Sequence, residues 1–184
     1  MPTPAPPPRL RTLVIGGARS GKSAYAERIV AGPDTPVRYV ATARRDPSDL
    51  DFEQRIAAHR ARRPAGWTVV ESAERPLPEI LLITDPAPTL VDDVGTWLTA
   101  VIDDADAWDL PRGSTAEHGR NLIAAVSGYQ GRLVLVTPEV GQGVIPASRS
   151  GRLFRDELGW LNQQLAVVCD EVQLVVAGLP LRLK

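Results

Sequence analysis

Residues 12–23 read Thr12-Leu13-Val14-Ile15-Gly16-Gly17-Ala18-Arg19-Ser20-Gly21-Lys22-Ser23. The apolar run 13–15 stops at a glycine, and the next positions match the phosphate-loop pattern of a glycine, four residues, a glycine, a lysine and a serine. Residues 23–30 then carry helix-forming and apolar side chains. A plain glycine-rich turn is the alternative reading. All the fixed positions are present between a strand and a helix, which favours the phosphate loop.

Such a loop is suited to binding phosphate. Its glycines let successive backbone N–H groups point at one anion, and the following helix N-terminus adds a partial positive charge. We expect Lys22 to reach the β- and γ-phosphates and the Ser23 hydroxyl to bind Mg²⁺. The predicted contacts of a nucleoside triphosphate are Gly16, Gly17, Ala18, Arg19, Ser20, Gly21, Lys22 and Ser23.

Size and composition indicate one ordinary globular domain. The chain has 184 residues, 43% of them hydrophobic, and a net charge of −1. We expect residues 11–184 to form a single catalytic domain after a disordered, proline-rich tail at 1–10. The small net charge argues against nucleic acid as a partner, and no apolar run approaches the roughly 20 residues that cross a bilayer. The single cysteine, Cys169, is expected to be a small buried hydrophobe, and its lack of a partner fits a reducing cytoplasm.

Strand-like and helix-like segments alternate along the chain. After the first strand we expect strands at 37–41, 67–71, 89–93, 132–137 and 170–177, with 181–183 pairing beside the last. Expected helices are 23–30, 49–62, 76–83, 94–102, 116–129 and 153–168. This alternation predicts a mostly parallel α/β sheet with helices on both faces, of the P-loop NTPase, RecA-like type.

Several chemically useful residues end or follow the expected strands. Because parallel strands end at one edge of a sheet, these residues should converge there: Gly16, Thr42, Glu71, Asp92 and Thr137. Asp92 is the candidate carboxylate for Mg²⁺, since a divalent cation needs hard oxygen ligands beyond Ser23 and the phosphates. Asp93 is the alternative, because a shift of one residue exchanges the two positions.

A basic segment surrounds one histidine. Arg55, His59 and Arg62 fall on one face of the expected helix, and Arg60 and Arg63 lie beside them. Neighbouring arginines favour a neutral, nucleophilic imidazole and can grip a polyphosphate. From the residues alone, a solvated helix face is the better interpretation.

The loop 138–151 is long for a plain connection, which favours a functional role at the carboxyl edge. The charged residues beyond it either contact an anionic substrate or pair with each other: Arg149, Arg152, Arg155 and Asp156.

Taken together, these segments resemble the bifunctional adenosylcobinamide kinase/adenosylcobinamide-phosphate guanylyltransferases of cobalamin biosynthesis. The resemblance runs from about residue 11 to residue 184. It rests on Gly-Gly-Ala-Arg-Ser-Gly-Lys-Ser (16–23), Tyr-Val-Ala-Thr-Ala (39–43), Arg-Ile-x-x-His with a following Arg-Arg-Pro and Trp (55–67), Glu71, Leu-Val-Asp (90–92), Thr-x-Glu-Val-Gly-x-Gly-Val-Ile-Pro (137–146) and Phe-Arg-Asp-x-x-Gly-x-x-Asn-Gln (154–163).

The resemblance implies two reactions. A nucleoside triphosphate phosphorylates adenosylcobinamide, and GTP then donates GMP through a guanylylated histidine to adenosylcobinamide phosphate. His59 matches that histidine and becomes a catalytic residue together with Lys22. The implied nucleotide contacts outside the phosphate loop are Thr42, Ala43, Arg44, Arg60, Arg62, Arg63, Glu71 and Asp92. The family also implies GTP, ATP and Mg²⁺ as cofactors and a homotrimer, while the choice between ATP and GTP in the kinase step stays open.

Three positions depart from the family pattern. Pro138 stands where asparagine is common, which predicts the loss of one side-chain hydrogen bond. Asp93-Val94-Gly95 stands where the family more usually has cysteine or leucine together with threonine, and this difference affects local helix capping. Ala58 stands where some relatives carry a second histidine. The alternative functions are a kinase of another small metabolite, in which His59 is only structural, and a nucleotide-dependent switch or assembly ATPase.

Overall fold

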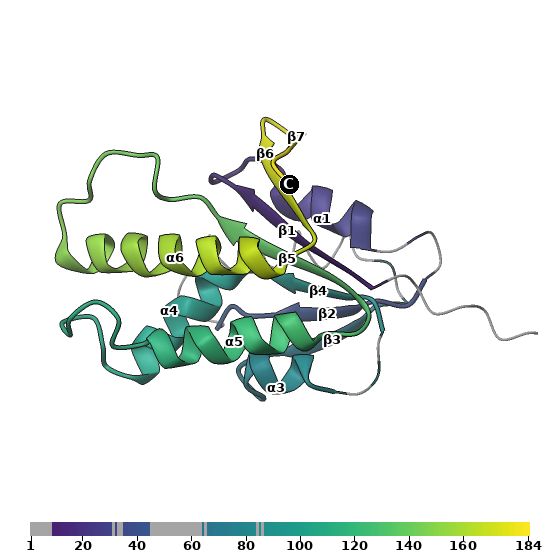
Figure 1. Ribbon diagram of the computed structural model, residues 1–184, viewed down its shortest axis with the longest axis horizontal. Coiled ribbons are helices and arrows are strands. Elements are labelled where there is room, and N and C mark those ends of the chain that lie inside the picture. Colours follow the sequence, from purple (N-terminus) through teal and green to yellow (C-terminus); the bar gives the residue numbers. More distant parts are fainter. Residues whose placement is uncertain are drawn as a thin grey trace, which may run out of the picture.

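A seven-stranded sheet forms the centre of the computed structural model, which describes residues 9–30, 32, 35–44, 64, 66–83, 85 and 87–184 (Figure 1). Its strand order is β3-β2-β4-β5-β1-β6-β7. In chain order the elements are β1 (Leu10–Gly16), α1 (Lys22–Val30), β2 (Arg38–Ala41), β3 (Thr68–Glu71), α3 (Leu77–Leu81), β4 (Thr89–Asp92), α4 (Val94–Asp104), α5 (Ala116–Gly128), β5 (Arg132–Pro138), α6 (Arg149–Val168), β6 (Glu171–Val176) and β7 (Leu179–Arg182).

The sheet is parallel except for its last strand. β1 pairs with β5 and β6, and β4 pairs with β2 and β5, all in parallel, whereas β7 returns antiparallel to β6. The phosphate-loop strand β1 and the carboxylate strand β4 are therefore separated by β5. Parallel neighbours require long crossover connections, which the intervening helices supply.

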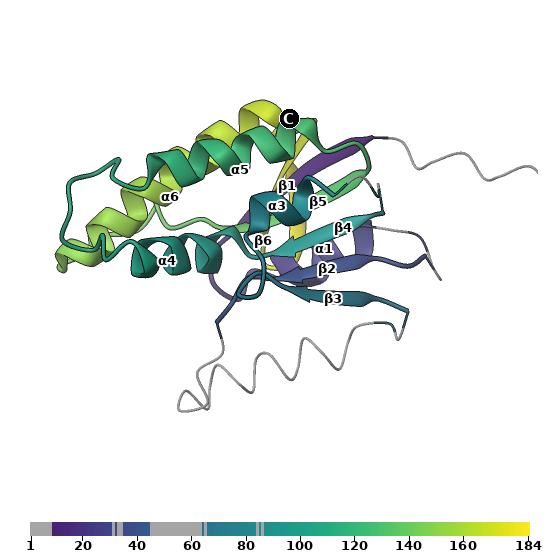
Figure 2. The same ribbon diagram turned by 90° about the horizontal axis from the view of Figure 1, so that it is seen from below.

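Successive residues of the central strands face opposite layers. Leu13 packs in the core under α3, α4, α5 and α6, whereas Val14 packs in a second core with Ala26 and Val30 of α1. Figure 2 shows α5 and α6 on one side of the sheet and α1 on the other. This alternation is what a strand buried on both faces requires. The predicted α/β sheet with helices on both faces is confirmed.

One expected helix boundary was wrong. The last helix was expected from residue 153, but α6 begins at Arg149, so the loop before it is shorter than predicted. Ser148 caps the helix by accepting a hydrogen bond from the Gly151 backbone N–H at 3.1 Å. A Cβ at position 151 would come within 2.8 Å of Pro146, so the glycine lets the first turn pack against the loop.

The charged residues of this helix bind the protein's own chain. Arg149 donates to the carbonyls of Asp109 and Leu110, and Arg152 donates to those of Pro146 and Ala147. Asp156 accepts from Arg155 and pairs with Arg112. The predicted pairing within this group is therefore seen for Arg155 and Asp156 only, and contact with an anionic substrate stays a prediction.

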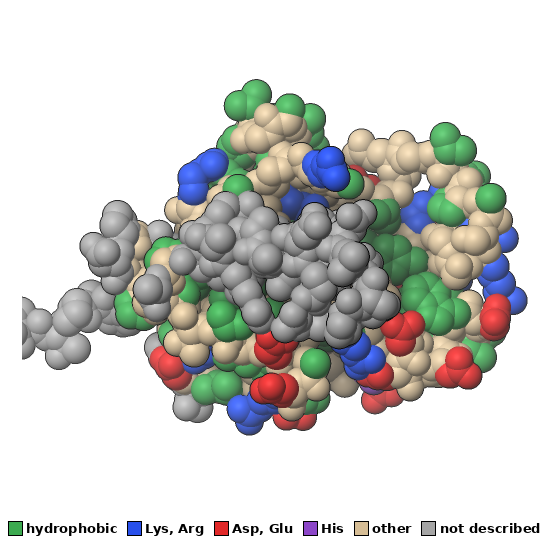
Figure 3. All heavy atoms as spheres, turned by 180° about the vertical axis from the view of Figure 1, so that it is seen from behind, with side chains coloured by type: hydrophobic (Ala, Val, Ile, Leu, Met, Phe, Trp, Pro, Cys, Tyr) green, Lys and Arg blue, Asp and Glu red, His purple; other side chains and the backbone are tan. Residues whose placement is uncertain are grey.

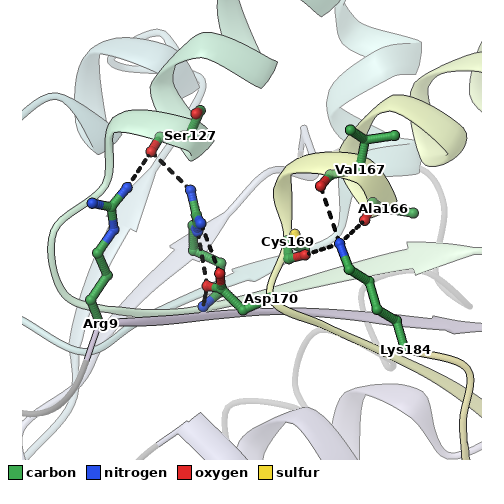
Figure 4. Close-up of polar contacts among 8 residues, drawn as sticks. Arg9, Ser127, Ala166, Val167, Cys169, Asp170 and Lys184 are labelled. Carbon is green, nitrogen blue, oxygen red and sulfur yellow. Dashed lines mark hydrogen bonds and ion pairs between the residues drawn. The ribbon is translucent and has the colours of Figure 1, made fainter.

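The two ends of the described chain are held near α5 and α6 (Figure 4). Arg11 forms a bidentate ion pair with Asp170. Both Arg9 and Arg11 also donate hydrogen bonds to the Ser127 carbonyl. The Lys184 ammonium donates to the carbonyls of Ala166, Val167 and Cys169. A lysine in this position binds the last carbonyls of α6, which have no partner within the helix.

Cys169 is buried, as expected. Its side chain is 1% exposed, and burial raises the pKa of the thiol to about 12, so the group stays neutral.

Two other expectations concern residues that lie wholly or mostly outside the described part of the chain. The predicted helix 49–62 lies outside them, as does most of the predicted tail; β1 begins at Leu10, the last residue assigned to that tail. Across the described residues, no helix combines the length and apolar character needed to span a membrane.

Candidate nucleotide and metal site

The phosphate loop joins β1 to α1. Gly16 ends the strand, and the backbone turns back through Arg19 (φ 57°) and Gly21 (φ 88°) before α1 begins at Lys22. A Cβ at position 16 would come within 2.8 Å of the Val175 carbonyl oxygen, so only glycine fits between the loop and β6. The strand, loop and helix occur in the order that the pattern predicts.

Polar groups of the loop are arranged to receive an anion. Lys22 Nζ donates to the Gly17 carbonyl at 3.3 Å, which folds the ammonium back over the loop. Ser20 Oγ is buried and has no hydrogen-bond partner among the residues that the structure describes. A buried hydroxyl without a partner is costly. A phosphate oxygen in the loop would supply that partner, so the residues fit the predicted triphosphate.

Asp92 lies across β5 from the loop and meets Ser23. Ser23 Oγ donates to Asp92 Oδ1 at 3.2 Å, and Tyr39 OH donates to the other carboxylate oxygen at 2.9 Å. The hydroxyl and the carboxylate are hard oxygen ligands of the kind that Mg²⁺ prefers. Within the described residues there is no cluster of three or more His, Cys, Asp or Glu side chains suited to a metal. A metal here would therefore take its remaining ligands from phosphate and water.

Asp93 has a different position from Asp92. Its carboxylate accepts from the Thr96 backbone N–H at 2.8 Å and caps the N-terminus of α4. The helix cap that the departure at 93–95 placed in question is therefore present. Of the two neighbouring carboxylates, only Asp92 contacts Ser23 in the described contacts.

Thr42 and Arg44, both predicted nucleotide contacts, bind opposite ends of α4. Thr42 is buried, donates to the Asp93 carbonyl at 2.6 Å and lies 2.6 Å from Thr96 Oγ1. Arg44 instead makes a two-pronged pair with Asp104, at the far end of α4, at 2.7 and 2.5 Å. The hydrogen bond from Arg44 holds the pKa of the Asp104 carboxyl below its ordinary value.

The strands meet in register at the carboxyl edge. Ala41 pairs with Glu71 and with Asp92, so β2, β3 and β4 end at one level of the sheet. Asp92 pairs with Val136, and Gly16 pairs with Pro138, so β1 and β5 extend two residues beyond that level. Ala43 and Glu71 are half-buried near this edge. His59, Arg60, Arg62 and Arg63 lie outside the described residues. Their predicted roles stay predictions.

Asn162 is a contributor whose role the sequence did not indicate. Its Oδ1 accepts from Thr137 Oγ1 at 2.6 Å, and its Nδ2 donates to the Pro138 carbonyl at 3.1 Å. The next backbone N–H, of Glu139, donates to the Gly16 carbonyl at 3.1 Å. Asn162 thus holds the end of β5, which holds the start of the phosphate loop. Its position on the apolar face of α6, between Leu158 and Leu165, was the available signal.

Pro138 has a packing role. A Cβ at position 95 would come within 2.6 Å of its ring, so Gly95 in the first turn of α4 leaves room for it. The two departures from the family pattern are therefore in contact with each other.

The C-terminal hairpin touches the phosphate loop from the other side. The Gly178 backbone N–H donates to the Ser20 carbonyl at 2.8 Å, from a turn in which Ala177 (φ 51°) and Gly178 (φ 79°) both have positive φ. The loop is thus held by β5 on one side and by the β6–β7 turn on the other.

Solved structures with a similar fold include one that is described as an ATPase. The assembled ATPase EscN of the type III secretion system of enteropathogenic E. coli aligns over 91% of this chain and 43% of its own, with a TM-score of 0.52 and 13% identity. A Pyrococcus horikoshii OT3 protein aligns over 95% of this chain and 86% of its own, with a TM-score of 0.50 and 13% identity. At such identity the likeness shows the fold alone.

Sequence relatives are much closer. The family model described as cobinamide kinase/cobinamide phosphate guanyltransferase matches residues 12–183. The bifunctional adenosylcobalamin biosynthesis protein CobP of Pseudomonas aeruginosa is 40% identical over 95% of this chain and 98% of its own. The protein of the same description, CobU, from Escherichia coli K12 is 39% identical over 94% of this chain and 98% of its own. The chain therefore belongs to the cobinamide kinase/cobinamide phosphate guanyltransferase family.

Proposed function

We propose that this chain phosphorylates adenosylcobinamide with a nucleoside triphosphate and then transfers GMP from GTP to the product, giving adenosylcobinamide-GDP. The nearly full-length match to the bifunctional family supports the pair of reactions. The structural observation on which the proposed nucleotide chemistry chiefly rests is the 3.2 Å contact between Ser23, on the helix after the phosphate loop, and Asp92.

In the kinase step the loop positions the triphosphate. The backbone N–H groups of residues 16–23 and Lys22 bind the phosphates, so the γ-phosphoryl group lies beside Ser23 and Asp92. These two residues are the proposed ligands of Mg²⁺, which neutralises charge on the phosphates when bound. The acceptor hydroxyl of the cobinamide arm then takes the γ-phosphoryl group, with loss of the nucleoside diphosphate.

In the second step we assign the nucleophile to His59. An imidazole nitrogen attacks the α-phosphorus of GTP; a P–N bond forms, and the P–O bond to pyrophosphate breaks. A phosphate oxygen of adenosylcobinamide phosphate then attacks the same phosphorus, and the P–N bond breaks to release the histidine. Arg60, Arg62 and Arg63 are proposed to bind the phosphates during this exchange.

A labelling experiment tests the histidine. The purified protein is incubated with α-labelled GTP and Mg²⁺, denatured, and the label is tested in acid and alkali. We expect an acid-labile, alkali-stable adduct in the parent and none in His59→Ala, which retains much of the kinase activity. Lys22→Ala is the contrast: it should lose both activities by at least about 10²-fold, because both need the triphosphate at the loop.

The two assignments fail separately. Production of adenosylcobinamide-GDP by His59→Ala at the parent rate would overturn the role of His59 and leave the kinase intact. Unchanged kinase turnover in Lys22→Ala would overturn the phosphate-loop assignment. A parent protein that binds GTP but forms no adduct would favour a monofunctional kinase.

We further propose, from the family resemblance, the use of GTP, ATP and Mg²⁺ and a homotrimer. A cytoplasmic location is proposed from the single cysteine, and one catalytic domain at 11–184 from the length of the chain. Acidic and basic side chains are interspersed on the described part of the face in Figure 3, and the net charge is −1. This mixture supports the prediction that nucleic acid is not a partner, since such binding relies on concentrated positive charge.

A further inference from the structure

A cavity of about 740 Å³ lies outside the phosphate loop. It is bounded by α3, α4 and α5 together with Arg44 after β2 and residues 72–74 after β3. Figure 2 shows these three helices near the ends of β2, β3 and β4. Its volume falls within the range of small-molecule sites in proteins. None of its lining residues belongs to the phosphate loop, although one of them, Arg44, is also an expected nucleotide contact.

The lining combines an apolar floor with a polar rim. Leu77 and Ala125 are buried in the floor, and the Trp97 side chain, only 5% exposed, forms part of the wall. The rim carries the Arg44–Asp104 ion pair, together with Glu74, Glu79, His118 and Asn121. An apolar surface with a few hydrogen-bonding groups around it is the usual make-up of a ligand site.

The cavity starts close to the nucleotide site. Trp97 follows Thr96, whose hydroxyl lies 2.6 Å from Thr42 Oγ1 and whose backbone N–H is bound by Asp93. Asp104, at the outer end of the cavity, is ten residues beyond the first residue of α4. At about 1.5 Å per residue, α4 carries the lining from the Asp93 cap to roughly 15 Å away.

This position is at the acceptor end of the bound triphosphate. Ser23 and Asp92 are the proposed Mg²⁺ ligands, so the β- and γ-phosphates of a bound nucleotide would lie beside them, and α4 begins two residues after Asp92. Transfer of the γ-phosphoryl group needs the acceptor in line beyond that phosphate. The nucleotide base is attached at the opposite, α-phosphate end. A cavity along α4 is therefore placed for the acceptor.

We propose that this cavity binds an edge of the corrin ring of adenosylcobinamide, with the aminopropanol arm directed along α4 toward Ser23 and Asp92. The inference rests on the proposed function, which supplies a corrinoid acceptor. A corrin edge presents methyl groups and amide side chains. The methyl groups match the floor around Trp97, and the amides match acceptors and donors such as Glu74 and Asn121 on the rim. A corrinoid is larger than the cavity, so part of the molecule stays outside it.

Filling the cavity tests the assignment. Ala124 lines it from an exposed position on α5, so Ala124→Phe occupies the space without altering the core. Arg120→Phe is the matched control, because it places the same side chain on an exposed position of α5 that is outside the lining. Asn121→Phe is a second filling variant, used should the first not fold. Circular dichroism checks the fold of each protein.

Two measurements distinguish an effect on acceptor binding from an effect on nucleotide binding. Equilibrium dialysis of adenosylcobinamide in the dark, without nucleotide, reports acceptor binding, and initial rates give KM for each substrate. We expect Ala124→Phe to raise both the Kd and the KM for adenosylcobinamide by at least about 10-fold, with the KM for the nucleotide and the GTP-dependent histidine label unchanged. Arg120→Phe should behave as the parent.

Each other outcome overturns the proposal. If the folded filling variants bind adenosylcobinamide like the parent, the corrinoid does not bind in the cavity. A raised nucleotide KM with unchanged corrinoid binding assigns the cavity to the base instead. A parent protein that does not phosphorylate adenosylcobinamide refutes the proposed function itself, whereas an active parent with indifferent filling variants refutes only the cavity assignment.

Discussion

Asp92 and Asp93 are adjacent carboxylates with separate contacts. Asp92 accepts from Ser23 and Tyr39, while Asp93 caps α4. The sequence placed a carboxylate at the end of this strand but left the choice open, because a shift of one residue exchanges the pair. The register of β4 with β2, in which Ala41 faces Asp92, settles which one is the last strand residue. Nothing in a single sequence reports that register.

The two positions should respond differently to substitution. Asp92→Asn keeps the shape but removes the charge beside Ser23, so we expect kinase turnover to fall on the order of 10²-fold with little change in stability. Asp93→Ala removes the cap of α4 and should lower the free energy of unfolding by about 1 kcal/mol. Steady-state kinetics and urea unfolding of both variants provide the measurement.

Asp93→Ser is the control for this comparison. Serine is also a good N-cap residue, so most of the stability lost in Asp93→Ala should return. Parent-like turnover in Asp92→Asn, together with a collapse of turnover in Asp93→Ser, would reverse the two assignments.

The elements themselves were largely predictable. Most strands and helices begin and end within a residue or two of expectation, because their apolar patterns and glycine or proline boundaries are strong. The start of α6 was missed because its first turn, Arg-Ser-Gly-Arg, is polar and contains a glycine that normally ends a helix. The Ser148 cap and the packing of Gly151 against Pro146 are tertiary features.

At the site, the contacts of Asn162 are likewise tertiary features that the sequence pattern did not predict. Its contacts with Thr137 and the Pro138 carbonyl join α6 to β5, elements that are separated by a loop in the sequence. We expect Asn162→Ala to lower the free energy of unfolding by about 2 kcal/mol, because the buried Thr137 hydroxyl loses its acceptor. Gln163→Ala, on the next and exposed residue, should change it by less than about 0.5 kcal/mol.

A double-mutant cycle identifies the cause of that loss. Thr137→Val removes the hydroxyl that Asn162→Ala leaves without a partner, so the two changes together should cost less than their sum. Urea unfolding of the parent, both single variants and the double variant gives the coupling. Strictly additive losses would show that the 2.6 Å contact contributes little to the fold.

At the scale of the whole molecule, alternation of strands and helices predicted the layered sheet but not its strand order. The position of β5 between β1 and β4 brings the phosphate loop, the Asp92 strand and the Thr137 strand to one edge. The convergence of strand ends followed from parallel pairing, whereas the order depends on how each crossover packs. The predicted histidine segment lies outside the described residues, so its contribution rests on the labelling experiment.

The stability that the Arg11–Asp170 ion pair gives to the fold should depend on pH. Asp170, at the start of β6, accepts hydrogen bonds from the Arg11 guanidinium, and this contact lowers the pKa of its carboxyl from 3.8 to about 2. Folding therefore favours the charged carboxylate. The pair stabilises the fold above about pH 4 and loses that contribution as the pH falls from 4 toward 2.

Asp170→Asn removes the charge and keeps the size of the side chain. Because the Asp170 side chain is 37% exposed, solvent screening limits the expected loss to about 1 kcal/mol of unfolding free energy at pH 7. Urea unfolding from pH 7 down to about pH 3 should show the difference from the parent shrinking, because the carboxyl of the unfolded chain, with its higher pKa, takes up a proton before that of the folded chain. Asp109→Asn makes the same charge change at a side chain that is 93% exposed, and should match the parent throughout. A difference that stayed constant with pH would mean that Asp170 stabilises the fold through its shape and backbone contacts rather than its charge.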